Sequence, residues 1–365
     1  MKKSLLALAV LGAYAGVASA QSSVTIFGVV DLSINQIKNG DAKTTSMQSN
    51  QLNSNRLGFR GFEDLGGGLG AGFWLEGAMS NQDGNAGGQT WQRRSTVSLI
   101  SQRGGEIRLG RDYDPSFWNL VFFDVYGANG IGNSTNLVPL SNPNGGAATV
   151  TTGVRTNNSI GYFLPGNLGG LYGQAQYALG QGNDNNKYWG ARIGFASGPF
   201  DAAFGYGDTK TATVGGVHIG DFTVTNIGAS WNFGVAKLFG LYNQNKWGSL
   251  KDSMWEISVS VPLGQGEFKA GYGDVDAKGT QNFAGVPVNY DHADATLWSL
   301  QYIYNLSKRT ALYGGYASLD NKSCGTPAAG ATNLCSARSI LPGTIAQNLT
   351  GNKSDGFNIG VRHSF

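Results

Sequence analysis

The feature that most constrains this chain is a repeated alternation of apolar and polar residues. In the final segment, Phe357, Ile359 and Val361 share one parity, whereas Asn358 and Arg362 have the other. A period of two indicates a β-strand with one apolar and one polar face, because a helix would scatter these residues around its circumference. Sixteen such segments occur along the chain: 24–35, 53–64, 68–79, 91–101, 105–112, 158–164, 171–179, 188–196, 200–209, 221–231, 235–246, 251–261, 267–275, 295–305, 310–320 and 355–365.

The breaks between these segments alternate between short and mostly longer ones. The break at 65–67 is short, for example, whereas the break at 113–157 is long. Antiparallel neighbours in an up-and-down barrel produce this alternation, and an even number of strands places both chain ends on the short-turn side. Tilted strands of about 9 to 11 residues can cross a bilayer's hydrocarbon core. The pattern predicts an all-β fold: a 16-stranded antiparallel transmembrane β-barrel with long external loops.

A soluble β-sandwich or a β-propeller also contains alternating strands. No repeat of propeller-blade length is evident, and in a soluble fold the polar faces of both sheets would have to meet bulk water. In hydrocarbon every backbone polar group must be paired internally, which only helices and closed barrels achieve. These considerations favour the barrel, with apolar residues outside and polar residues inside.

The first twenty residues have the organisation of a secretory signal peptide. Lys2 and Lys3 precede an apolar run at 5–13, and the small residues at 18–20 form a cleavage site. A retained membrane anchor is the alternative, but the apolar run is shorter than the roughly 20 residues that a spanning helix needs. We therefore predict a cleaved signal peptide at 1–20 and a barrel domain at 21–365.

The charge of the chain argues against nucleic acid as a partner. The chain has 26 basic and 23 acidic residues, and removal of residues 1–20 deletes two lysines, which leaves 24 − 23 = +1. Phosphate recognition needs an excess of clustered Lys and Arg. The charged fraction of 13% is about half of the typical value of about 25%. Low charge together with 57 glycines and many aromatic residues indicates extended chain in a medium that disfavours charge.

Aromatic residues lie near the ends of many segments, where an amphipathic ring would meet a membrane interface. The alternative role is ordinary core filling. The residues concerned are Trp91, Tyr113, Tyr172, Tyr188, Tyr206, Trp231, Tyr242, Trp247, Trp255, Tyr272, Trp298 and Tyr313.

Cys324 and Cys335 are the two cysteines of the chain. Export to an oxidising compartment predicts a disulfide that closes a local loop. Metal binding is the weaker alternative, since no histidine is near them in sequence and two ligands do not make a zinc site. We expect no metal and no cofactor.

Four motifs resemble the trimeric Gram-negative general porins, across essentially the whole chain after residue 20. They are 23–31, 55–66, 109–113 before the long break, and 361–365. The resemblance implies a sixteen-stranded barrel in the outer membrane, with three copies per assembly and the third external loop, 113–157, folded into each pore. It also implies surrounding lipid and lipopolysaccharide, passage of small ions and solutes, and a terminal Phe365 that the barrel-assembly machinery reads.

Charged residues on the inner face are the candidate determinants of selectivity. Parity places Arg56, Arg60 and Arg94 inward, opposite apolar neighbours such as Leu57. The cost of about 2 to 4 kcal/mol for a charge on the lipid face reinforces that placement. Arg111 has the outward phase of Leu109 and faces the lumen only if the strand bulges or has ended there. The resemblance matches Arg56 and Arg94 to an arginine cluster of anion-preferring members.

Arg155 is a third candidate for this cluster. In the 113–157 break, Asp114 and Asp124 would form an acidic side opposite the arginines and create a transverse field. The alternative is that the arginines pair with wall carboxylates such as Glu76, Glu106 or Asp112 and only stabilise the wall. Since the inward arginines outnumber the loop carboxylates, we predict a preference for anions.

Three other functions are compatible with parts of the sequence. A substrate-specific channel for small organic acids or sugars could use an aromatic track formed by Trp74, Trp118, Phe122 and Phe123. The long break at 321–354 could act in a receptor or structural role. Catalysis has little support, because His218, His292 and His363 lie near no recognisable nucleophile motif.

Overall fold

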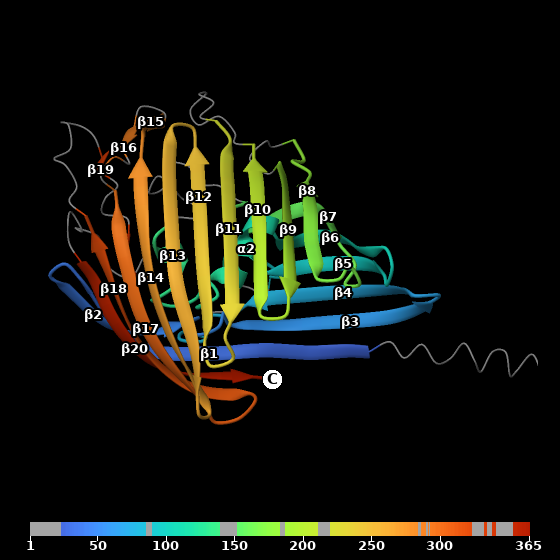
Figure 1. Ribbon diagram of the computed structural model, residues 1–365, viewed down its shortest axis with the longest axis horizontal. Coiled ribbons are helices and arrows are strands. Elements are labelled where there is room, and N and C mark those ends of the chain that lie inside the picture. Colours follow the sequence, from blue (N-terminus) through green and yellow to red (C-terminus); the bar gives the residue numbers. More distant parts are fainter. Residues whose placement is uncertain are drawn as a thin grey trace, which may run out of the picture.

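The computed structural model describes most of the chain as a closed ring of antiparallel strands (Figure 1). The predicted signal peptide, Cys324 and Cys335 lie outside the described residues, so their assignments stay predictions. Among the described residues, no helix is both long and apolar enough to cross a membrane. The described residues are 23–84, 90–138, 152–182, 187–210, 220–283, 286–289, 291, 293–322, 332–333, 338–340 and 353–365.

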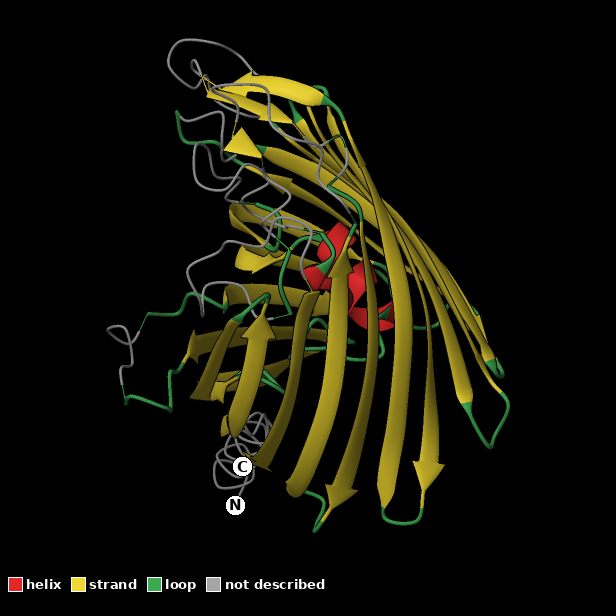
Figure 2. Ribbon diagram, turned by 90° about the vertical axis from the view of Figure 1, so that its left-hand side faces the viewer, coloured by secondary structure: helices red, strands yellow, loops and turns green. Residues whose placement is uncertain are grey.

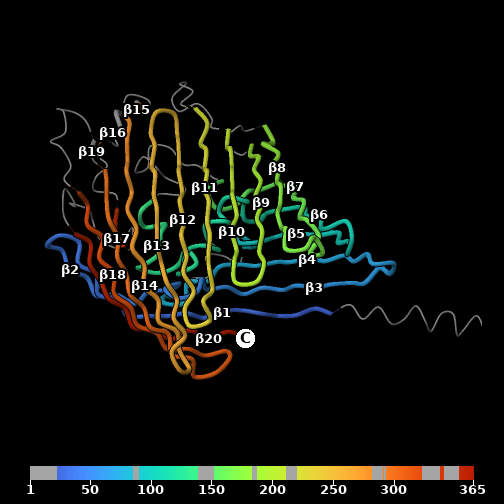
Figure 3. The backbone as a smooth tube through the Cα atoms, viewed as in Figure 1, coloured from blue at the N-terminus to red at the C-terminus, as the bar shows by residue number. Residues whose placement is uncertain are grey.

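Sixteen strands form the wall, and each overlaps one of the sixteen alternating segments. The wall strands are β1 (Ser23–Asn39), β3 (Arg56–Gly66), β4 (Leu69–Ala78), β5 (Arg94–Ser101), β6 (Gly105–Tyr113), β7 (Arg155–Phe163), β8 (Leu171–Ala178), β9 (Tyr188–Ser197), β10 (Phe200–Thr209), β11 (Phe222–Asn232), β12 (Lys237–Trp247), β13 (Leu250–Leu263), β14 (Gly266–Lys278), β17 (Ala295–Asn305), β18 (Thr310–Asn321) and β20 (Lys353–Ser364). Figure 3 shows the tight turns that join β9 to β10 and β11 to β12 at the lower end of the view. The predicted barrel is confirmed.

The first and last wall strands close the ring. β1 pairs with β3 from Ser23 to Val29 and with β20 from Val29 to Asn39. A further strand, β2 (Ala42–Ser49), pairs with β1. It lies in the break between the first two predicted strands, where no strand was predicted. Three short strands, β15 (Thr280–Phe283), β16 (Val286–Asn289) and β19 (Thr332–Asn333), form a separate small sheet. Because β1 has partners on both sides, the ring has no open edge there.

The two faces of the wall differ as the alternation predicts. Along β20, Phe357, Ile359 and Val361 are exposed on the outer face, whereas Asn358 is buried inside. Of the predicted interfacial aromatics, Trp231, Trp255 and Trp298 are exposed among others, as a girdle requires. The girdle prediction is wrong for Tyr188, Trp247 and Tyr313, which are buried, and for Tyr113 and Tyr172, which face the interior of the barrel. Tyr313 points inward, and its hydroxyl donates to Asp31 Oδ1 at 2.5 Å.

The interior holds a helix and an apolar core. The helix α2 (Pro115–Phe123) lies between opposite sides of the ring (Figure 2) and contacts β8 to β12. A 3-10 turn, η1 (Ser134–Asn136), follows it. The core includes Leu120 and Phe123 of the helix, Leu137 after it, and Met254 of β13. The described part of the 113–157 segment therefore packs against the inside of the wall.

A second inward segment, 338–340, contacts the loop at η1 and at the residue that follows it. Arg338 forms a buried ion pair with Asp252 on β13 at 2.6 Å and donates to the carbonyl of Leu137. Ile340 joins the same core, and its carbonyl accepts from Asn136 Nδ2 at 3.2 Å. These contacts hold the loop after α2 in a fixed position relative to the wall.

Candidate functional site

The helix α2 is fixed to the inner wall by buried amide groups. Asn119 donates to the carbonyl of Ala203 at 3.1 Å and to Asn226 Oδ1 at 2.9 Å. Arg192 on β9 donates from Nε to Asn119 Oδ1 at 2.9 Å, and Asn226 donates to the carbonyl of Ser116 at 2.8 Å. A buried network with satisfied polar groups specifies one arrangement. The helix is therefore a rigid partition inside the barrel.

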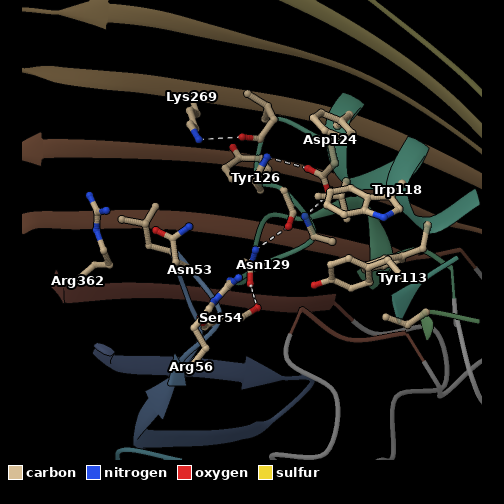
Figure 4. Close-up of a pocket in the computed structure, with 18 of the residues that line it drawn as sticks. Asn53, Ser54, Arg56, Tyr113, Trp118, Asp124, Tyr126, Asn129, Lys269 and Arg362 are labelled. Atoms are coloured by element: carbon tan, nitrogen blue, oxygen red, sulfur yellow. Dashed lines mark hydrogen bonds between the residues drawn. The ribbon is translucent and has the colours of Figure 1, made fainter. Parts of the chain in front are cut away.

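A cavity of about 690 Å³ lies between this helix and the opposite part of the wall. Figure 4 shows Arg56, Lys269 and Arg362 on wall strands, Trp118 on the helix, and Tyr113 at the end of β6 just before the helix. The basic and carboxylic side chains that line the cavity are those of five basic residues, Arg56, Arg93, Arg155, Lys269 and Arg362, and of two acids, Asp124 and Glu267. Their formal sum is 5 − 2 = +3. The lining is thus strongly basic although the whole chain is nearly neutral.

Two of these arginines share one carboxylate. Glu76 on β4 lies 3.3 Å from Arg56 Nη1 and 2.5 Å from Arg93 Nε. Arg93 also donates from Nη2 to the hydroxyl of Tyr113 at 3.0 Å. One negative charge is set against two positive charges, so this group keeps a net charge of +1. Arg56 therefore does pair with a wall carboxylate, which was the alternative to a role in selectivity. This pairing does not neutralise the two arginines.

The positive charges of Arg155 and Arg362 are less balanced by nearby carboxylates than those of Arg56 and Arg93. The guanidinium of Arg155 lies 4.2 Å from the ring centroid of Tyr113. Arg362 donates from Nη1 to Ser364 Oγ at 3.3 Å. Within the described part of the chain, neither guanidinium has a carboxylate within ion-pair distance. Together with the net charge of +1 on the group of Arg56, Arg93 and Glu76, these two residues supply the positive charge that is available to a solute.

Arg60 and Arg94 line a second, smaller recess of about 300 Å³ in the wall. Both guanidinium groups lie over the ring of Trp74, at 5.3 Å for Arg60 and 4.6 Å for Arg94. Arg94 also lies 3.7 Å from Asp112. The inward direction that parity predicts for these residues agrees with their place, but they line a different cavity from Arg56 and Arg155.

Arg111 lines neither cavity. The pairing of β6 with β7 shifts between Gly110 and Asp112, and Gly110 has φ +127°. A Cβ at Gly110 would lie 2.1 Å from the carbonyl oxygen of Ser95, so this bulge requires glycine. The Arg111 side chain donates to the carbonyl of Gln92 at 2.6 Å and to the exposed Asn157 at 2.5 Å. The bulge that could have turned Arg111 inward is present, but the side chain stays apart from the cavity.

The two loop aspartates have structural partners. Asp114 is the N-cap of α2 and accepts from the N–H of Phe117 at 2.7 Å and from Ser116 Oγ at 2.6 Å. Burial raises the pKa of Asp114 to about 6. Asp124 lines the cavity but accepts from Ser134 and from the N–H of Tyr126 at 2.8 Å, and burial raises its pKa also. The acidic side opposite the arginines is therefore weaker than the sequence indicated.

The role of Asp114 can be tested with two substitutions. Asp114→Asn should leave both the ion selectivity and the open-channel noise as in the parent, because an amide oxygen can also cap a helix. Asp114→Ala removes the cap, which is worth about 1 kcal/mol, and should increase the noise as the first turn frays. Single-channel recording measures both. A marked change of selectivity in Asp114→Asn would instead show that the carboxylate acts on the permeating ions.

Sequence reasoning missed Arg93 and Lys269. Parity along 91–101 places Arg93 outward, but β5 begins at Arg94, so the residue before it is free to turn inward. Lys269 shares the inward phase of Glu267 and Gly271, and this signal could have identified it. Its ammonium donates to the carbonyl of Val125 at 2.9 Å. Strand ends are thus where the alternation loses its predictive value.

Comparisons with known proteins extend over nearly the whole chain. A family model described as Gram-negative porin matches residues 7–323. The chain is 40% identical over 380 residues to outer membrane porin protein 32 of Delftia acidovorans, with 100% of each covered. An outer membrane porin protein of Bordetella pertussis is 27% identical, with 87% of this chain and 94% of that protein covered. The solved structure of an anion-selective porin from Comamonas acidovorans has a TM-score of 0.78 and 36% identity, with 94% of this chain and 100% of that chain covered.

Proposed function

Because the chain belongs to the Gram-negative porin family, we propose that its barrel forms a water-filled channel across the outer membrane that prefers anions to cations. The channel serves passive diffusion of small hydrophilic solutes. The observation that carries the preference is the cavity beside α2, in which five basic residues face two carboxylic acids. The similarity in fold to the anion-selective porin from Comamonas acidovorans also supports a preference for anions.

The preference follows from electrostatics in a confined space. A unit charge 6 Å from the path of an ion contributes about 0.7 kcal/mol even at the dielectric constant of water, which changes the local ion concentration about threefold. A low-dielectric wall strengthens the interaction further. Arg155 and Arg362 carry most of this effect in our proposal, because the charges of Arg56 and Arg93 are partly balanced by Glu76.

The proposal is tested by substitutions that separate the candidate arginines. Arg155→Ala and Arg362→Ala should each lower the chloride-to-potassium permeability ratio about threefold or more, and the double variant should lower it further. Arg56→Ala should lower the ratio as well, because the group of Arg56, Arg93 and Glu76 then loses its net charge of +1. Arg94→Ala tests whether a charge in the second recess also affects the permeability ratio. The measurement is the reversal potential of reconstituted protein in a KCl gradient.

Arg111→Ala is the matched control, because it removes the same charge outside both cavities. Its permeability ratio should equal that of the parent. Equal shifts in Arg111→Ala and Arg155→Ala would contradict the assignment, since they would show that only the total charge of the chain matters.

The assembly and its partners complete the proposal. We propose a homotrimer surrounded by outer-membrane lipid and lipopolysaccharide, delivered by the barrel-assembly machinery; the family resemblance and the exposed apolar outer face support this. The proposal includes no catalytic activity. The relatives are porins, and His363 lies on the exposed side of β20, where Nδ1 is 2.9 Å from Thr310 Oγ1.

A further inference from the structure

The side of the cavity that faces the basic wall is aromatic. Tyr113, Trp118 and Phe122 all line it. Trp118 and Phe122 are stacked with ring centroids 5.4 Å apart and 25° between the planes, and Tyr113 meets Trp118 edge to face at 5.1 Å. Phe122 is 51% exposed. A half-exposed phenyl ring inside a polar lumen is a costly feature.

The packing of the helix does not account for these rings. Phe117, Leu120 and Phe123 are buried and attach α2 to the wall. Trp118 and Phe122 are four positions apart in sequence, so they lie on the same side of the helix. This side differs from the one that attaches α2 to the wall. Phe122 also lies under the guanidinium of Arg192, at 4.6 Å from its ring centroid. The rings are held in place, yet their exposed edges face the cavity.

The cationic and aromatic parts of the lining are continuous. Arg155 lies over the ring of Tyr113, and Tyr113 contacts Trp118, which stacks on Phe122. One small molecule can therefore reach both an arginine without a carboxylate partner and an exposed ring. The cavity volume of about 690 Å³ lies within the range of about 300 to 1,000 Å³ that is usual for small-molecule sites.

From this arrangement we propose that the constriction binds small aromatic monocarboxylates in transit, with the carboxylate toward Arg155 and Arg362 and the ring against Trp118 and Phe122. This inference rests on the proposed anion channel and adds the class of solute that the channel retains. An inorganic anion meets only the charges of this site. A neutral aromatic solute meets only the rings. An aromatic carboxylate meets both at once.

The test measures how three solutes block the chloride current through single reconstituted channels. Phenylacetate carries the ring and the charge, acetate carries the charge alone, and 2-phenylacetamide carries the ring alone. An aromatic contact should lower the half-blocking concentration of phenylacetate about fivefold below that of acetate. The half-blocking concentration of 2-phenylacetamide should be higher than that of phenylacetate by a similar or larger factor. Equal block by phenylacetate and acetate, or by phenylacetate and 2-phenylacetamide, would overturn the inference.

Phe122→Ser should abolish the difference between phenylacetate and acetate while chloride conductance persists. Phe233→Ser is the matched control, because it removes an exposed phenyl ring from a turn outside the cavity, and it should keep the difference. If Phe122→Ser does not assemble, Phe122→Leu retains an apolar side chain and removes only the ring. A phenylacetate preference that survives loss of this ring would contradict the site.

The reversal potential in KCl separates this inference from the proposed function. An anion-selective channel that does not distinguish phenylacetate from acetate would refute only the aromatic site. A cation-selective parent would refute the proposed preference itself, and with it the premise of the inference.

Discussion

Gly228→Leu is expected to reduce single-channel conductance several-fold while the barrel still assembles. Gly228 is on the inner face of β11, directly under the helix. A Cβ at this position would lie 2.2 Å from the side chain of Phe123, which is only 1% exposed. Close-packed interiors do not absorb such a clash, and overpacking typically costs about 1 to 3 kcal/mol. We expect α2 to leave the wall and move into the lumen, where it obstructs the path of ions.

Gly240→Leu is the matched control for this prediction. Gly240 lies on the neighbouring strand β12, and a Cβ there would meet no atom within 4 Å. Its conductance should equal that of the parent. If Gly228→Leu conducts as the parent does, α2 is not pressed against β11 in the working channel.

Deletion of Phe365 is expected to lower the yield of assembled barrel several-fold. Phe365 and Gly28 exchange two backbone hydrogen bonds, both 3.1 Å long, beyond the end of β20. The ring of Phe365 covers Gly28, where a Cβ would lie 2.3 Å from the phenyl Cζ atom. The deletion removes both bonds and this cover at the seam between the first and last strands, which leaves unpaired backbone groups at a membrane-exposed edge.

Heat-modifiable migration of membrane fractions on gels measures the assembled fraction. Phe365→Tyr keeps the backbone bonds and an aromatic ring and should assemble as the parent does. Channels that form from the deletion variant should have the parent's reversal potential, because the deletion removes no charged side chain. Normal assembly of the truncated chain would refute both the closing role and the predicted assembly signal.

The fold could be predicted almost entirely from the sequence, for a physical reason. Each wall strand separates a polar lumen from an apolar medium, so its residues must alternate along its whole length. The alternation in 355–365 alone gave the correct two faces of β20. Helix α2 was not predicted, because its residues Pro115–Phe123 are apolar on several sides and meet both a wall and a cavity.

The site could be predicted only where a regular strand fixes the direction of a side chain. Arg56, Arg60 and Arg94 have the inward direction that their parity indicates. Arg93 precedes a strand, where parity no longer applies. Arg111 lies in the bulge between Gly110 and Asp112, yet its outward parity agrees with its place apart from the cavity.

Asp114 and Asp124 show a different limit. The sequence gives their charge, but it does not show that loop N–H and hydroxyl groups occupy their oxygens. The aromatic side of the cavity likewise depends on how α2 is rotated. That rotation is set by long-range contacts such as Asn119 with Asn226.

The most direct test of the central claim is the reversal potential of the unmodified protein in a planar bilayer between dilute and concentrated KCl. The basic cavity predicts a potential with the sign of chloride permeation. It also predicts that the selectivity weakens as both salt concentrations are raised, because added ions screen the arginines. A potential with the sign of potassium permeation would contradict the account.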